Sequence, residues 1–146
     1  MKNLHLEEVN EENWRILFEL QEEQKRYVSD PYKLLARAWA YRKQRSRAYV
    51  IYVDETPVGM ALYYDLAQAK AYDFSQLFID CNYQGKGYGE NAARQILARM
   101  KEDGKYNKVT LCYIEGNEAA RCLYEKLGFR ETGEVDEDEI VMVKEL

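Results

Sequence analysis

The chain has 146 residues, 47% of them apolar and 32% charged, which is enough to bury a core and excludes a chain that is disordered by composition. The net charge of −5 argues against a broad nucleic-acid interface and favours a cationic partner. No apolar run reaches membrane-spanning length, the N-terminus is not a signal peptide, and three cysteines without a C-x-x-C pair are typical of reduced thiols, so we expect a single cytoplasmic domain over residues 1–146.

The first half of the chain predicts two helices among four strands. Leu4 and Leu6 alternate with polar neighbours, as in a strand. Asn10 can cap one helix, and Asp30 with Pro31 can begin another. The chain should begin with a strand over 3–8 and a helix over 11–24, whose one face carries Trp14, Leu17, Phe18 and Gln21. The second helix carries Leu35, Ala38 and Trp39 on one face and ends in a basic run. Strands over 48–53, 58–65 and 71–80 follow, the first two joined by a turn at 54–57.

The second half alternates between helix and strand. Gly104 and Gly128 are expected to end its two helices. The predicted elements are a helix over 90–100, a strand over 109–114, a helix that starts after Gly116-Asn117, and strands over 129–134 and 140–144. A strand-helix-strand unit implies parallel pairing, and the hairpins imply antiparallel pairing. The sequence therefore predicts a mixed α/β sheet with helices on both faces.

Three glycines fall within the stretch Gln84-Gly85-Lys86-Gly87-Tyr88-Gly89, between a predicted strand and a predicted helix. Glycine permits positive φ angles and the close approach of a ligand. The free N–H groups and dipole at a helix start suit a phosphate. A Rossmann loop would need a third glycine where Glu90 stands, and the spacing of a P-loop is absent. The stretch therefore predicts a phosphate-bearing ligand held by another kind of loop.

The pattern Gln-x-x-Gly-x-Gly resembles the acetyl-CoA pyrophosphate loop of the GNAT superfamily of N-acetyltransferases. Residues 77–83 look like the family's L-x-V-x-P-x-Y, with Cys81 where proline is commoner, and residues 117–129 resemble its second signature, N-x-x-A-x-x-L-Y-x-K-x-G-F. The resemblance is firm over residues 71–134. It implies the GNAT acyltransferase fold, a mixed, mostly antiparallel twisted sheet in the order β-α-α-β-β-β-α-β-α-β-β, with acetyl-CoA as cosubstrate and no metal.

The resemblance also implies where acetyl-CoA binds. In the family, the strand before the loop splays from the next strand, and the pantetheine arm lies in the gap, where a backbone N–H can bind the thioester oxygen. Asn117 would contact the pantetheine or acetyl end, and it can cap a helix at the same time. The implied cofactor-binding residues are Phe78, Ile79, Gln84, Gly85, Lys86, Gly87, Tyr88, Gly89, Asn117 and Tyr124.

Two side chains are candidates for the chemistry. The resemblance implies that Tyr124 is the general acid that protonates the departing thiolate, and its structural alternative is a core tyrosine on an amphipathic helix. The resemblance also implies that the base often lies, directly or through water, on the strand before the glycine loop. Strand alternation puts Asp73, Ser75, Leu77 and Ile79 on one face there, and Asp73 is the acidic group on that face, so it is the candidate base; its alternative is an exposed strand-end carboxylate. Asp80 is the second acidic candidate for the base, but it is expected on the opposite face and nearer the loop, so Asp73 is preferred. We expect His5, the one histidine, to be structural, so a histidine-based mechanism and a zinc site are not expected.

The acceptor is less specified. Residues 24–28 followed by Leu34, Leu35 and Ala38 resemble the bacterial spermine/spermidine acetyltransferase branch, and so do residues 51–60 and 63–65. A polyamine suits acidic, tyrosine-rich walls. The acidic candidates are Glu19, Glu22, Glu23 and Asp65, and the run 136–139 is expected to be a hairpin turn that borders the acceptor mouth, as in the family. Three functions stay open: a polyamine N-acetyltransferase that acts by direct attack in a ternary complex, an acetyltransferase for another amine such as a protein N-terminus or an aminoglycoside, and a non-catalytic acetyl-CoA sensor. Dimers are common in the superfamily, and the sequence leaves the oligomeric state open.

Overall fold

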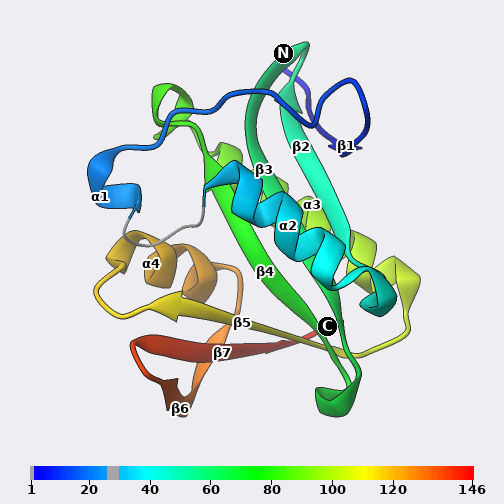
Figure 1. The fold of residues 1–146 in the computed structure, drawn as a ribbon. Coiled ribbons are helices and arrows are strands. Elements are labelled where there is room, and N and C mark those ends of the chain that lie inside the picture. The colour runs from blue at the N-terminus through cyan, green and yellow to red at the C-terminus, as the bar shows by residue number, and fades with distance from the viewer. Residues whose placement is uncertain (1, 26–29) are drawn as a thin grey trace.

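A computed structural model describes residues 2–25 and 30–146, which form a seven-stranded sheet in the order β1-β2-β3-β4-β5-β7-β6 (Figure 1). The strands are β1 (Leu4–Glu8), β2 (Arg47–Val53), β3 (Thr56–Leu66), β4 (Ala71–Ile79), β5 (Lys108–Ile114), β6 (Arg130–Asp136) and β7 (Glu139–Glu145). The helices are α1 (Glu22–Lys25), α2 (Pro31–Ala40), α3 (Tyr88–Asp103) and α4 (Glu118–Lys126), with short 3-10 turns η1 (Arg42–Gln44), η2 (Ala67–Ala69) and η3 (Cys81–Tyr83). Each neighbouring pair is antiparallel except β4 and β5. The predicted mixed, mostly antiparallel sheet and both hairpins are confirmed.

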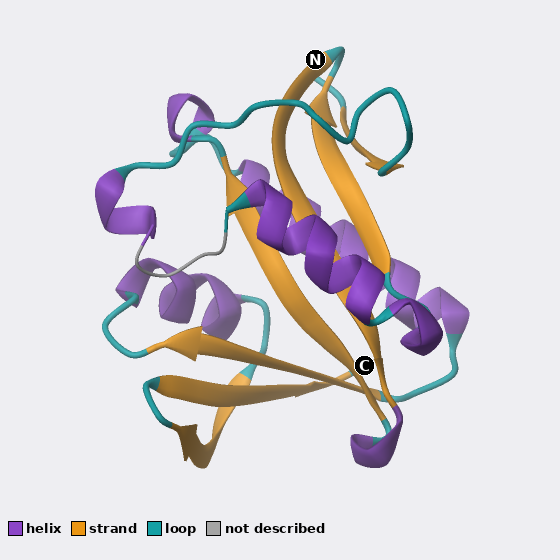
Figure 2. Cartoon of the chain, in the orientation of Figure 1, coloured by secondary structure: helices purple, strands orange, loops and turns teal. Residues whose placement is uncertain are grey.

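Helices cover both faces of this sheet (Figure 2). On one face α2 buries Leu34 completely against a cluster drawn from β2, β3 and β4. On the other face α3 buries Ala93, Ile96 and Met100 against the larger cluster, and it ends at Gly104, which adopts a left-handed conformation as predicted. None of the helices in the described residues combines the length and the apolarity that a membrane span requires.

β4 and β5 pair over a short distance and then diverge (Figure 1). Their parallel register covers Tyr72 with Val109 and Asp73 with Thr110. The other edge of β4 stays paired with β3 as far as Ile79. Beyond residue 73, β4 therefore presents one edge to a wedge-shaped gap in the sheet, which is the divergence that the GNAT resemblance implies.

The predicted helix over residues 11–24 is wrong. The Asn10 side chain accepts hydrogen bonds from the Glu12 and Asn13 amides, but it caps a single turn, and regular helix returns only in the one-turn α1. In between, the side chains that pack are Ile16, Phe18 and Leu20, at a spacing of two, while Leu17 is 79% exposed. The apolar residues of this stretch fit both the period of a helix and the period of two of an extended chain. Packing against α2 and the sheet selects the extended conformation.

The second helix begins as predicted, because the Asp30 carboxylate accepts from the Lys33 amide and Pro31 occupies the first turn. Its buried face is shifted from the prediction. Leu34 is the fully buried residue, and Trp39 is 67% exposed with the Arg42 guanidinium stacked 4.1 Å from its ring centre. Leu34 and Leu35 are adjacent in sequence, so apolar residues point to more than one side of this helix. Contact with the sheet decides which side is buried.

A β-bulge corrects the predicted face of Asp73. The register of β3 with β4 moves from Leu62–Gln76 to Tyr63–Phe74, which leaves Ser75 as the extra residue. The bulge reverses the alternation along β4, so Leu77 and Ile79 pack in the same cluster as Tyr72 and Phe74, opposite to Asp73. Strict alternation would have placed Asp73, Ser75, Leu77 and Ile79 together, and that prediction is wrong.

Candidate active site

The glycine stretch forms an open cradle between β4 and α3. Gly85 and Gly87 have φ angles of 78° and 81°, and a Cβ atom at either would meet nothing within 4 Å. These glycines are therefore needed for their backbone conformation, and the space beside them is free for a ligand. Gly87 caps α3 without a side-chain hydrogen bond, so N–H groups of the first turn point outward, towards a place that suits an anion.

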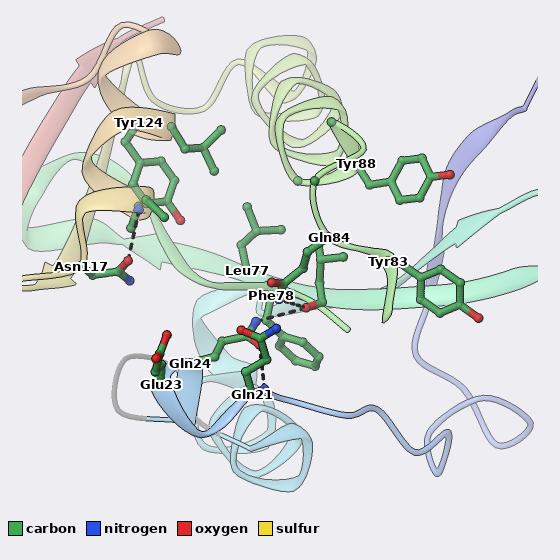
Figure 3. Close-up of a pocket in the computed structure, with 17 residues that line it drawn as sticks. Gln21, Glu23, Gln24, Leu77, Phe78, Tyr83, Gln84, Tyr88, Asn117 and Tyr124 are labelled. Carbon is green, nitrogen blue, oxygen red and sulfur yellow. Dashed lines mark hydrogen bonds between the residues drawn. The ribbon is translucent and has the colours of Figure 1, made fainter. Parts of the chain in front are cut away.

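Two amide side chains bind the end of β4 at the edge that faces away from β3. Gln84 Nε2 and Gln24 Nε2 donate to the Ile79 carbonyl oxygen at 2.8 and 3.1 Å (Figure 3). Because the N–H and C=O of one strand residue point to the same side, the Ile79 N–H also points into the gap between β4 and β5. Gln84 therefore braces the end of the strand. Gln24 was named in the sequence only as part of the polyamine-like stretch, and nothing in that pattern indicated this contact.

A cavity of about 440 Å³ runs along this edge from the glycine loop to α4 (Figure 3). Lys86 is exposed and lies outside its lining, whereas the other residues predicted to bind the cofactor line it. Its walls are the free edge of β4, the loop, α4 and the short helix α1. The lining residues are Gln21, Glu23, Gln24, Leu77, Phe78, Ile79, Tyr83, Gln84, Gly85, Gly87, Tyr88, Gly89, Asn117, Ala119, Ala120, Leu123 and Tyr124.

Tyr124 and Asn117 come from α4 and lie across the cavity from β4 (Figure 3). The half-buried Tyr124 ring makes edge contacts with Phe74 and Phe129, and burial raises the pKa of its phenol to about 12. The phenol is therefore protonated at neutral pH. Asn117 Oδ1 accepts from the Ala120 amide at 3.2 Å, so Asn117 caps α4 and faces the cavity at the same time.

A second cavity of about 310 Å³ meets the first, and Leu77, Asn117, Ala120 and Tyr124 line both. Asp73 lies in its wall and accepts a hydrogen bond from the Thr110 hydroxyl at 3.2 Å. Burial raises the pKa of this carboxyl, and hydrogen bonds from Tyr64 and Thr110 and the charge of Arg37 oppose the increase. The other lining residues are Arg37, Tyr41, Tyr64, Ser75, Gln76, Cys112, Tyr113, Ile114 and Glu139.

Several sequence candidates for the acceptor site lie elsewhere. Asp65 is 4% exposed and pairs with Arg45, Lys105 and Arg47 at 2.7, 3.2 and 3.5 Å, outside both cavities. Glu22 pairs with Lys25, and Glu19 receives a hydrogen bond from Asn82, whereas Glu23 lines the first cavity. Residues 26–28 of the polyamine-like stretch lie outside the described part of the chain.

Two other sequence alternatives are settled by their contacts. Asp80 is buried and accepts from the amides of Glu19 and Asn82, so it fixes the loop after β4 and is not free to act as a base. His5 stacks on Tyr52 with 5.4 Å between ring centres and lines neither cavity, as a structural residue would. Within residues 2–25 and 30–146, no group of three or more acidic, histidine or cysteine side chains is arranged to hold a metal.

The acidic turn contributes one residue to the second cavity, Glu139, which is the first residue of β7. Arg37 was not anticipated there, although it was visible in the sequence as a polar position on the second helix. Arg37 reaches the cavity only because of the face that α2 packs against the sheet, and the sequence pattern did not determine that face.

Residues 10–129 match the sequence profile of the Acetyltransferase (GNAT) family. The spermine/spermidine N(1)-acetyltransferase of Bacillus subtilis (strain 168) is 40% identical over 72 residues, which are 49% of this chain and 47% of that protein, so the chain spans about half the length of the curated relatives it matches. Two solved structures share the fold at 18% identity: an aminoglycoside acetyltransferase in complex with coenzyme A (TM-score 0.80, covering 98% of this chain and 95% of that one) and the spermidine N-acetyltransferase of Vibrio cholerae in complex with CoA and spermine (TM-score 0.74, covering 97% and 95%).

Proposed function

The chain belongs to the Acetyltransferase (GNAT) family, and on this premise we propose that it transfers the acetyl group of acetyl-CoA to a primary amine. The observation that carries the proposal is the meeting of two cavities at Tyr124, with the glycine cradle at the far end of one and Asp73 in the wall of the other. The first cavity suits an elongated cofactor whose phosphate groups lie at the glycine cradle, and the second cavity suits a small acceptor.

Acetyl-CoA would enter with its pyrophosphate on the N–H groups of residues 85–89 and its pantetheine arm along the free edge of β4. The thioester then lies near the junction of the cavities. The Ile79 N–H points into this gap and would bind the thioester oxygen as it gains negative charge. Asn117 would contact the end of the arm from α4.

In the reaction the acceptor nitrogen attacks the thioester carbonyl carbon directly, the carbon–sulfur bond breaks, and Tyr124 gives its proton to the leaving thiolate. The proton lost by the amine passes to Asp73. Asp73 lies six residues before Ile79, and at about 3.3 Å per residue this is too far for direct contact with the thioester, so the proton would have to pass along a chain of water molecules in the second cavity. The neutral amine thus loses one proton and the thiolate gains one. Asp73 then releases its proton to solvent and the Tyr124 phenolate takes one back, so both side chains return to their starting states.

The acceptor that we propose first is a polyamine such as spermidine or spermine. Two observations support a polyamine. A spermine/spermidine N(1)-acetyltransferase aligns with half of this chain, and two carboxylates, Asp73 and Glu139, lie in the wall of the second cavity. An assay that follows thiol release from acetyl-CoA with spermidine, a peptide N-terminus and an aminoglycoside separates the functions. We expect turnover of spermidine. Turnover of the peptide or aminoglycoside alone would replace the polyamine with another amine, and CoA binding without turnover of any amine would indicate a sensor.

The Asp73→Asn variant tests the base. We expect kcat/KM for the amine to fall by about tenfold to a hundredfold at neutral pH, because the amide cannot take a proton. A carboxylate acts as a base only above its pKa, so wild-type activity should fall as the pH drops through the pKa of Asp73. Since burial raises that pKa, this acidic limb should lie above the value of about 3.9 for an ordinary aspartate.

The measurement is the pH dependence of kcat/KM in wild type and variant, and the variant should lack the acidic limb. The amine substrate titrates near 10, roughly like lysine, and gives a separate limb at high pH. Asp54→Asn, in the β2–β3 turn outside both cavities, is the matched control. An unchanged acidic limb in Asp73→Asn would exclude Asp73 as the base.

A further inference from the structure

The second cavity contains charges of both signs that do not neutralise one another. Its charged lining residues are Arg37 from α2, Asp73 from β4 and Glu139 from β7. Arg37 donates to the Ser75 hydroxyl at 3.1 Å, and in the described residues neither Arg37 nor Glu139 has an ion-pair partner within 4.0 Å. Each charge is therefore free to act on whatever enters the cavity.

The fold separates these charges into two walls. Arg37 belongs to the helix that packs over β2 and β3, and it reaches the cavity from that side of β4. Glu139 lies beyond β5, because β7 follows β5 in the sheet and Glu139 pairs with Ile114. Asp73 lies between them, on the strand that joins the two sides. The cavity thus has a cationic wall at α2 and an anionic wall at the start of β7.

The bulge at Ser75 contributes to the cationic wall. Ser75 is the extra residue of β4, and its hydroxyl accepts a hydrogen bond from Arg37. The hydrogen bond fixes the guanidinium at the cavity wall, although the side chain is otherwise exposed. A long basic side chain without such a contact would extend into water, where its charge would be screened.

We propose that this charge polarity selects and orients the acceptor, with a second ammonium group of a diamine or polyamine held by Glu139 and kept away from Arg37. The inference rests on the proposed acetyl transfer to a primary amine. Glu139 attracts the distal ammonium, and Arg37 repels any binding mode that turns the chain of the acceptor towards α2. Arg37 is thus a residue that excludes a wrong orientation, and specificity often depends on such repulsion.

The test compares 1,4-diaminobutane with 1-aminobutane, which differ by the second amine, in wild type, Glu139→Gln and Arg37→Gln. We expect Glu139→Gln to lower kcat/KM for the diamine by about fivefold, as for loss of one partly exposed ion pair, and to change the monoamine less than about twofold. We expect Arg37→Gln to raise the ratio of diamine to monoamine turnover by about threefold, because the repulsion is removed.

The unchanged monoamine rate in each variant serves as the check that the protein is folded and binds acetyl-CoA. Glu134→Gln is the matched control, because Glu134 is an exposed acid on the neighbouring strand β6 that lines neither cavity. If it lowers diamine turnover as much as Glu139→Gln, general attraction by an acidic surface explains the effect and the inference is overturned.

Two further results would also overturn it: an equal loss on both amines in Glu139→Gln, or a selective loss on the diamine in Arg37→Gln. If the wild type turns over the monoamine but not the diamine, the proposed acetyl transfer survives and the inference fails. If it turns over neither of these amines but acetylates spermidine, a peptide N-terminus or an aminoglycoside, the proposed acetyl transfer survives and the inference fails. If it acetylates none of them, both fail.

Discussion

Tyr124→Phe should lower kcat by about a hundredfold, the scale of a general acid, while KM for acetyl-CoA stays within about twofold. Tyr124 lines both cavities and is the phenol at their junction. Burial raises its pKa to about 12, so the proton is in place at neutral pH, and the thiolate of the product, with a pKa of about 8.5, accepts it only as the bond breaks. The ring contacts with Phe74 and Phe129 survive the substitution, which removes one oxygen.

The measurement is steady-state thiol release with both substrates varied. Tyr106→Phe is the matched control, because Tyr106 packs edge-on against Tyr72 with 5.2 Å between ring centres and lines neither cavity. It should keep wild-type kcat. Unchanged turnover in Tyr124→Phe would remove Tyr124 as the acid, and an increase in KM for acetyl-CoA without a change in kcat would make it a binding residue instead.

Gly59→Ala should destabilise the protein by about 3 kcal/mol, at the upper end for an overpacked site. β3 and β4 approach so closely there that a Cβ atom would stand 2.1 Å from the Phe78 carbonyl oxygen. The obstacle is backbone, which cannot rotate away as a side chain can. Because Gly59 pairs with Ile79, the strands would have to separate beside the edge that we propose binds the thioester.

Urea unfolding measures this change as a shift in midpoint at constant slope. Gly89→Ala is the control for stability, since a Cβ there would meet only the Ile79 side chain, at 3.7 Å, and alanine suits a helix better than glycine by about 1 kcal/mol. We expect Gly89→Ala to unfold at or above the wild-type midpoint. If Gly59→Ala unfolds at the same urea midpoint as Gly89→Ala, the contact of β3 with β4 is looser than the structure indicates.

The parts of the fold that the sequence predicted are those where one local signal dominates. The cap at Asp30, the left-handed stop at Gly104 and the strand-loop-helix at Gln84–Gly89 each depend on residues close in sequence. The stretch after Asn10 failed because helical and extended spacings coexist there, and only contact with α2 and the sheet distinguishes them. Local signals alone cannot make that choice.

The same limit applies to the candidate site. Asn117 and Tyr124 could be placed from one signature, because Asn117 caps the helix α4 that contains Tyr124. Arg37 from α2 and Glu139 from β7 line opposite walls of one cavity, and no spacing in the sequence relates them. The bulge at Ser75 was equally hidden, since it is defined by pairing with β3 and reverses the facing of Asp73 relative to Leu77.

The divergence of β4 and β5 divides the sheet into two blocks, β1-β2-β3-β4 and β5-β7-β6. The blocks share backbone pairing at two residue positions. A strand that is unpaired along one edge usually invites another strand or is covered by water. Here an extended arm of acetyl-CoA would take the place of the missing strand and bridge the blocks. Cofactor binding would then complete the sheet as well as supply the acetyl group. Because acetyl-CoA would bind only the folded chain, it would also stabilise the protein against unfolding.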